Sequence, residues 1–228
     1  MPRVCVFDVN ETLLDLRALD PAFAQVFGDT AVRREWFTQM IQSALVATVT
    51  GVYAPFGQIG AAALSMVAAR RGVTLTEDAR QQLLSGMRSL PPHPEVRSAL
   101  ERLRSAGLRL AALTNSTAEV AEAQLAHAGL AELFELRLSV DAVRRLKPAP
   151  EAYQMAAERL GVPLGEIRLV AAHAWDIAGA LRAGCAGAFV ARPGMVLDPL
   201  VPAPDVVGSD MAEVAEGILA ADGVHPKA

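Results

Sequence analysis

Residues 4–15 read VCVFDVNETLLD, and this stretch decides the fold. Residues 3–7 form a short, largely apolar run that is typical of a strand buried on both faces. Asp8 ends the run, and Asn10 and Thr12 follow it. In an open α/β sheet, ligands bind at the carboxyl ends of the strands. A carboxylate placed there can attack an electrophilic carbon or phosphorus atom, or it can simply cap the next element.

The composition excludes several classes of protein. The net charge of the 228 residues is −4, with both signs spread along the chain, which argues against a nucleic-acid partner. No apolar run approaches the roughly 20 residues of a membrane span. The first residues lack a secretory signal, so we expect a cytoplasmic protein with no membrane partner. The two cysteines and four histidines show no metal-binding spacing, so we expect no metal site.

The periodicity of the chain changes at Pro91, Pro92 and Pro94. Before these prolines, helical patterns follow one another without a strand, at residues 33–49, 57–71 and 76–90. After them, strands alternate with helices, and the strands are expected at residues 108–113, 136–139, 167–171, 188–191 and 205–207. Such alternation predicts parallel βαβ units with right-handed crossovers. We therefore expect an α/β fold, with a doubly wound, Rossmann-like parallel sheet core at residues 1–15 and 91–228 and an inserted all-helical cap domain at 16–90.

Polar side chains follow several of the expected core strands at the edge where the cap would lie. They include a carboxylate, hydroxyls, an ammonium group and a second carboxylate, and they are Asp8, Asn10, Thr12, Thr114, Asn115, Lys147, His173, Trp175 and Asp176. One polar strand end is common in α/β proteins. Several at one edge predict a catalytic site.

Four motifs in this set resemble those of the haloacid dehalogenase superfamily, and most closely the branch of L-2-haloacid dehalogenases. They are FDVNETL at 7–13, LTNS at 113–116, Lys147-Pro148 followed by Tyr153, and HAWDIAGA at 173–180. The Ala-Trp-Asp element is specific to the branch, whereas the other motifs mark the superfamily. The resemblance covers essentially the whole chain, including a helical cap inserted after the first motif.

The resemblance implies hydrolytic dehalogenation of short 2-haloalkanoic acids, without a cofactor or metal. Asp8 would displace the halide, and water would hydrolyse the resulting ester. The implied catalytic residues are Asp8, Thr12, Lys147 and Asp176, and the implied substrate-binding residues are Thr114, Asn115, Phe56, Trp175 and Tyr153. His173 and Asn10 lie in the same motifs but differ from the family's residues, and we add them as a candidate catalytic and a candidate substrate-binding residue. Lys147 would keep Asp8 ionised, because a nearby ammonium group lowers the pKa of a carboxylate. Asp176 would hold Lys147 and help to place or activate water. Thr12 and Thr114 would orient Asp8 and bind the substrate carboxylate, and Asn115 would cradle the halide.

The sequence departs from these relatives at the site itself. Asn10 stands where they typically carry a tyrosine, and His173 stands where they carry an asparagine. Phe37, which we expect to pack within the cap, stands where they carry a halide-binding arginine. Arg33 and Arg34 lie one helical turn earlier and could reach the site instead. His173 could replace part of the lost donor as a cation, or position water as a base, or have no catalytic role.

Two other functions compete with dehalogenation. A magnesium-dependent phosphatase would need an acid two residues after Asp8 and a second carboxylate four residues before Asp176, but the chain has Asn10 and Ala172 there. A non-catalytic small-acid binder would have no need of an ionised carboxylate at a strand end. Members of the dehalogenase branch are often homodimers, so a homodimer is expected here too.

Overall fold

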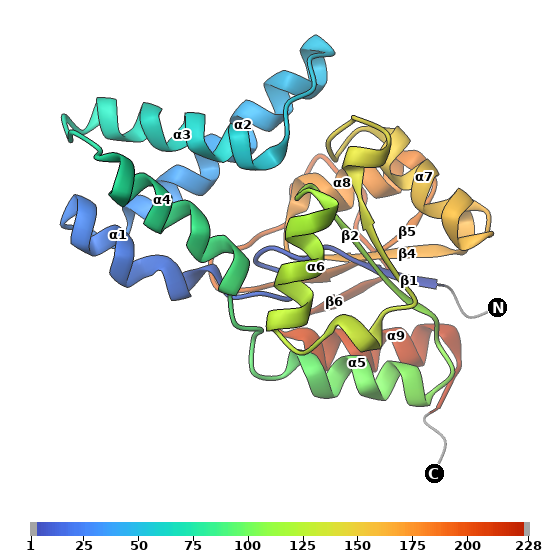
Figure 1. Cartoon of the computed structure of the whole chain (residues 1–228). Coiled ribbons are helices and arrows are strands. Elements are labelled where there is room, and N and C mark those ends of the chain that lie inside the picture. Colours follow the sequence, from blue (N-terminus) through green and yellow to red (C-terminus); the bar gives the residue numbers. More distant parts are fainter. Residues whose placement is uncertain (1–3, 226–228) are drawn as a thin grey trace.

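A parallel sheet of six strands forms the centre of the computed structural model, which describes residues 4–225 (Figure 1). The strand order is β3-β2-β1-β4-β5-β6. The strands are β1 (Val4–Phe7), β2 (Leu110–Thr114), β3 (Leu136–Ser139), β4 (Ile167–Ala171), β5 (Ala186–Val190) and β6 (Val206–Gly208). Residue 3, which we expected in the first strand, lies outside the described residues. Every residue of β1, β2 and β4 is buried, as expected for central strands covered on both faces.

Helices cover both faces of the sheet. Those of the core are α5 (Val96–Ser105), α6 (Ala118–His127), α7 (Pro150–Leu160), α8 (Ala174–Ala183) and α9 (Met211–Asp222). Helix α5 packs beside α9 on one face, and α7 packs beside α8 on the other (Figure 1). This is the doubly wound arrangement that the alternating pattern predicted. Because the chain runs outward from β1 in both directions, the carboxyl ends of β2, β1 and β4 are neighbours.

A group of helices between residues 16 and 90 lies beside the edge of the sheet where β1 ends (Figure 1). They are α1 (Asp20–Phe27), α2 (Val32–Thr50), α3 (Phe56–Arg70) and α4 (Glu77–Ser85). Trp36 anchors their own apolar interior, with its ring centroid 5.3 Å from that of Phe23 and its indole N–H donating to the Gly60 carbonyl. The helices are stabilised because their apolar residues pack against one another, and the Phe23 and Trp36 rings are part of this packing.

The two connections between these helices and the sheet run side by side. The Asp15 N–H donates to the Pro91 carbonyl at 2.9 Å, and the His93 N–H donates to the Leu13 carbonyl at 2.9 Å. This paired linker lies next to the predicted boundaries at residues 15 and 91. The division into core and cap at those residues stays a prediction.

None of the helices in the described part of the chain is long and apolar enough to cross a membrane.

Candidate active site

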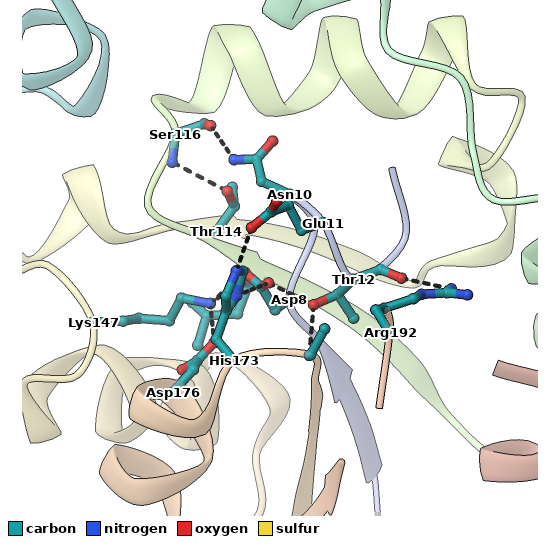
Figure 2. Close-up of polar contacts among 12 residues, drawn as sticks. Asp8, Asn10, Glu11, Thr12, Thr114, Ser116, Lys147, His173, Asp176 and Arg192 are labelled. Atoms are coloured by element: carbon teal, nitrogen blue, oxygen red, sulfur yellow. Dashed lines mark hydrogen bonds and ion pairs between the residues drawn. The ribbon is translucent and has the colours of Figure 1, made fainter. Parts of the chain in front are cut away.

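Three adjacent strands place the polar side chains at one edge of the sheet. Asp8 directly follows β1, Asn115 directly follows β2, and His173 precedes α8 after the end of β4. Lys147 comes from the loop between β3 and α7. All four side chains are buried, and Figure 2 shows those of Asp8, Lys147 and His173 lying close together.

A buried ammonium group links two carboxylates. Lys147 Nζ lies 2.8 Å from Asp8 Oδ1 and 2.6 Å from Asp176 Oδ2, and it also donates to the Leu113 carbonyl at 3.0 Å. Asp176 Oδ1 accepts a hydrogen bond of 2.6 Å from the Tyr153 hydroxyl. Lys147 and Asp176 are fully buried as side chains. Both oxygens of Asp176 are therefore engaged, which favours a role in holding Lys147.

The pKa values follow from this arrangement. Burial works to raise the pKa of Asp8, but the charge of Lys147 and the contact with His173 outweigh it, so the pKa lies well below its usual range. Burial works to lower the pKa of Lys147, but Asp176 and Asp8 raise it above its usual value. Burial raises the pKa of Asp176 despite its ion pair with Lys147. Asp8 is consequently a carboxylate at neutral pH, as a nucleophile must be.

Thr12 and Asn115 fix the geometry of the centre. The Thr12 hydroxyl donates to Asp8 Oδ2 at 2.7 Å and accepts from the Ala172 N–H at 2.9 Å. The Asn115 side-chain oxygen accepts from the Lys147 backbone N–H at 2.8 Å. The carboxylate of Asp8 is thus held in one orientation by groups from three segments of the chain.

His173 lies on the open side of Asp8. Its Nδ1 is 3.3 Å from Asp8 Oδ2, and its Nε2 is 3.0 Å from Glu11 Oε2 (Figure 2). The ring stacks between Phe37 and Trp175, with centroid distances of 5.9 and 5.2 Å. Burial works to lower the pKa of His173, but the two carboxylates raise it from 6.5 to about 9. The imidazole therefore carries a positive charge at neutral pH.

The raised pKa of His173 makes stability depend on pH. A group whose pKa is higher in the folded state stabilises the fold fully below its unfolded pKa and loses this contribution as pH rises through the folded value. For His173 the window runs from 6.5 to about 9, and the contribution is at most about 3 kcal/mol. We expect the free energy of unfolding to fall across this window in urea titrations. A His173→Gln variant should lose that pH dependence, and an unchanged profile would contradict the assignment.

A small cavity of about 10 Å³ opens onto Asp8. Its lining residues come from both the sheet edge and the cap, and they are Asp8, Asn10, Phe37, Ile41, Phe56, Asn115, His173 and Trp175. A single water needs about 10–15 Å³ of such space. The cavity therefore has room for about one water, and a larger substrate requires the cap or its side chains to move.

The donor set does not favour a divalent metal ion. A metal beside Asp8 would need further carboxylates, but the Asn10 amide contacts Ser116 and Gln124, and position 172 is alanine. Lys147 already provides a positive charge at 2.8 Å from Asp8. Among residues 4–225, no group of three or more His, Cys, Asp or Glu side chains is placed to hold a metal ion.

Comparison with known proteins identifies the family. A sequence model of the haloacid dehalogenase-like hydrolases matches residues 2–184. The chain belongs to the haloacid dehalogenase-like hydrolases. It is 32% identical over 214 residues to (S)-2-haloacid dehalogenase 2 of Pseudomonas sp. strain CBS-3, covering 93% of both chains. It is 30% identical over 201 residues to haloacetate dehalogenase H-2 of Moraxella sp. strain B, covering 87% of this chain and 90% of the relative.

A solved member of this hydrolase family has the same fold. The structure of L-2-haloacid dehalogenase from Xanthobacter autotrophicus with chloropropionic acid covalently bound superposes with a TM-score of 0.89 at 25% identity. The match covers 97% of this chain and 99% of the other. The Rossmann-like core with a helical cap, predicted from the sequence, is therefore confirmed as the fold of this haloacid dehalogenase-like hydrolase.

The structure distributes the predicted site residues over two layers. Those that line the cavity are Asp8, Asn10, Asn115, Phe56, His173 and Trp175. Those behind it are Thr12, Lys147, Asp176, Tyr153 and Thr114. The Thr114 hydroxyl accepts a hydrogen bond of 3.1 Å from the Ser116 N–H and so contacts the loop after β2. The roles assigned to these residues stay predictions.

Two residues of the cavity region add to what was expected. Phe37 packs against Trp36 within the cap, as expected, and its ring also lines the cavity and stacks on His173. Glu11 was not predicted as a site residue, although its carboxylate contacts His173. The sequence feature that could have indicated Glu11 is its position between Asn10 and Thr12, which places it in the same turn. Arg33 contacts Glu11 and Asp20, so it reaches the site only through Glu11.

Gly179 allows α8 to approach the loop that carries Lys147. A Cβ atom at this position would lie 2.5 Å from Pro148 Cβ and 2.6 Å from the Tyr153 hydroxyl. We expect Gly179→Ala to lower the free energy of unfolding by about 1–3 kcal/mol, because the packed segments must move apart. Gly57→Ala is the control, since its Cβ would meet no atom within 4 Å. Equal effects of the two substitutions in chemical denaturation would contradict this explanation.

Proposed function

We propose that this hydrolase removes halide from short 2-haloalkanoic acids and releases 2-hydroxy acids through an ester on Asp8. The observation that carries the proposal is the buried Asp8 carboxylate, paired with Lys147 at 2.8 Å and facing a small cavity with apolar walls. A carboxylate of low pKa beside apolar walls suits attack on carbon, because it is ionised and only weakly solvated. The names of the relatives in the two comparisons agree with this chemistry.

Each residue near Asp8 has a role in this reaction. Lys147 keeps Asp8 ionised, and Asp176 and Tyr153 hold Lys147 in place. Thr12 orients Asp8 by its hydrogen bond of 2.7 Å. The attacking oxygen of Asp8 forms a bond to carbon while the carbon–halogen bond breaks, and the halide leaves with the bonding pair.

The remaining cavity residues hold the substrate. Phe56, Phe37 and Trp175 supply apolar walls, while Asn10 and Asn115 supply amide groups. His173 provides a positive charge, which favours entry of an anionic substrate. The cavity is small, so the substrates are expected to be short acids. We propose that no metal takes part.

Halide release from chloroacetate, fluoroacetate and both enantiomers of 2-chloropropionate tests the function. We expect release that EDTA does not reduce and that Mg²⁺ does not accelerate. In a single turnover in H₂¹⁸O, we expect one labelled oxygen on Asp8. The proposal would be wrong if no acid released halide and the protein showed phosphatase activity that requires Mg²⁺. The protein would then be a magnesium-dependent phosphatase.

We also propose that the enzyme is a cytoplasmic homodimer. Both cysteines, Cys5 and Cys185, are buried and unpaired, which fits a reducing compartment. Val46 and Val49 near the end of α2, and Val52 just after it, expose 57%, 86% and 64% of their surface, which fits a partner surface there. Light scattering of wild type and of Val49→Lys tests the dimer. A monomeric wild type would contradict it.

A further inference from the structure

One ring nitrogen of His173 has no hydrogen-bond partner, although it is buried. Nδ1 lies 3.3 Å from Asp8 Oδ2, an ion-pair distance without the alignment of a hydrogen bond. The side chain lines the cavity that has room for about one water. In the resting enzyme the partner of Nδ1 is therefore the charge of the Asp8 carboxylate, which an ester on Asp8 would remove. The position of Nδ1 favours contact with a water beside the Asp8 carboxyl carbon.

Glu11 fixes the other ring nitrogen. Glu11 Oε2 lies 3.0 Å from Nε2 of His173, which orients the ring and directs Nδ1 toward Asp8. The backbone of Glu11 has a φ of +61°, a left-handed conformation that costs a residue with a Cβ roughly 1–2 kcal/mol. Backbone strain of this kind persists at functional sites, where the surrounding structure enforces it. The strained turn is what brings the carboxylate to His173.

The cap completes this arrangement. Arg33 of α2 lies 3.5 Å from Glu11 Oε1 through Nη1, and its Nε donates to Asp20 at 2.6 Å. The side chain of Arg33 is 11% exposed. Nucleophile, histidine and carboxylate thus form a chain from Asp8 through His173 to Glu11, and a cap cation holds its far end.

Asp176 is poorly placed to activate water. Lys147 occupies Oδ2 at 2.6 Å, and Tyr153 occupies Oδ1 at 2.6 Å. Asp176 is completely buried and does not line the cavity. His173 is the basic side chain among the residues that line it.

We propose that His173, oriented by Glu11, is the general base that activates water to hydrolyse the Asp8 ester. The inference rests on the proposed function, because it requires that ester. Water attacks Cγ of Asp8 while Nδ1 of the neutral imidazole takes a proton from it. The bond from Cγ to the ester oxygen then breaks, and the departing hydroxy-acid oxygen takes the proton from Nδ1. The new carboxyl group of Asp8 gives its proton to Nδ1, which restores the resting carboxylate and imidazolium.

Formation of the ester itself prepares the base. Asp8 and Glu11 together raise the pKa of His173 in the resting enzyme. Esterification removes the charge of Asp8, so the burial that lowers the pKa of His173 is then opposed only by Glu11, whose charge Arg33 partly neutralises. Asp176 is offset by Lys147, and Phe37 and Trp175 bring no charge to the ring faces. The imidazolium then loses its proton to solvent as the halide leaves, and the two half-reactions use opposite protonation states.

Rapid mixing of His173→Gln with chloroacetate tests the proposal. We expect a burst of about one chloride per site, followed by steady-state release about 10²–10⁴-fold slower than in wild type. Intact-mass measurement should show the Asp8 ester accumulating, with the mass of the substrate less its chloride. His127→Gln, an exposed residue at the end of α6, is the control and should behave as wild type. The burst also reports that the variant is folded.

Glu11→Gln tests the positioning residue. Removal of the charge should lower the pH at which ester hydrolysis reaches half of its maximum rate, while the chloride burst persists. An unchanged pH profile in this variant would overturn the role of Glu11.

Two results for His173→Gln would overturn the proposal while the proposed function stands. The first is a steady-state turnover rate close to that of wild type. The second is the absence of a chloride burst together with the absence of an ester on Asp8. If wild type released no halide, the proposed function would fail, and the inference would fail with it. These outcomes are distinguishable because the first two require an active wild-type enzyme.

Discussion

Asp8→Asn should reduce halide release by at least about 10⁴-fold, because the amide is a poor nucleophile and no neighbouring carboxylate can replace it. Asp176 shares Lys147 with Asp8, but Lys147 and Tyr153 engage both of its oxygens, and the Glu11 carboxylate contacts His173 and Arg33. The amide keeps the shape of the carboxyl group, so the fold should be retained. Initial rates with chloroacetate, together with circular dichroism, measure the effect.

The companion experiment for Asp8→Asn follows the intermediate. Wild type, quenched during turnover, should carry the ester on the peptide that contains Asp8, and the variant should carry none. Thr12→Val is a useful comparison, because it removes only the hydrogen bond of 2.7 Å to Asp8 and should reduce the rate far less. Substantial halide release by Asp8→Asn would show that another residue is the nucleophile.

Lys147→Met should produce the largest loss of stability, about 3–5 kcal/mol in the free energy of unfolding. Removing one partner of a buried ion pair leaves an uncompensated charge, and here two carboxylates lose their shared cation. Methionine is chosen because its side chain has a similar length and no charge. Activity should fall as well, because the pKa of Asp8 rises when Lys147 is lost. Urea denaturation at neutral pH measures the stability.

Arg88→Met is the matched control for Lys147→Met. Arg88 pairs with Glu119 at 2.9 Å, but its side chain is 49% exposed, so the loss should be within about 1 kcal/mol. The double variant Lys147→Met/Asp176→Asn should recover part of the stability, because it removes one of the stranded charges. Equal losses for Lys147→Met and Arg88→Met would show that solvent screens the buried centre.

The core of the fold could be predicted because its strands and helices have distinct patterns. The apolar run before Asp8 and the alternation after Pro94 each indicate elements that the structure contains. Strand ends were less accurate, since β5 begins at Ala186 and not at residue 188. Gly187 lies in that strand, and a small residue gives little apolar signal even where it is buried.

The site was predictable where it depends on strand ends and not where it depends on the cap. The polar residues after β1, β2 and β4 meet because parallel strands end at one edge. The contacts of Phe37 and Arg33 depend on how α2 lies over that edge, which no local pattern specifies. Glu11 was missed because its carboxylate reaches His173 only through a left-handed turn, a conformation that glutamate rarely adopts.

The left-handed backbone of Glu11 means that stability and activity favour different residues at position 11. Glycine adopts a φ of +61° without a steric penalty, so it would relieve the turn, but it would remove the carboxylate beside His173. A laboratory evolution experiment that rewards only heat resistance should therefore enrich glycine at position 11, whereas one that rewards growth on a halogenated acid should retain glutamate. The residue found at position 11 would then show whether the protein had been selected for stability or for activity.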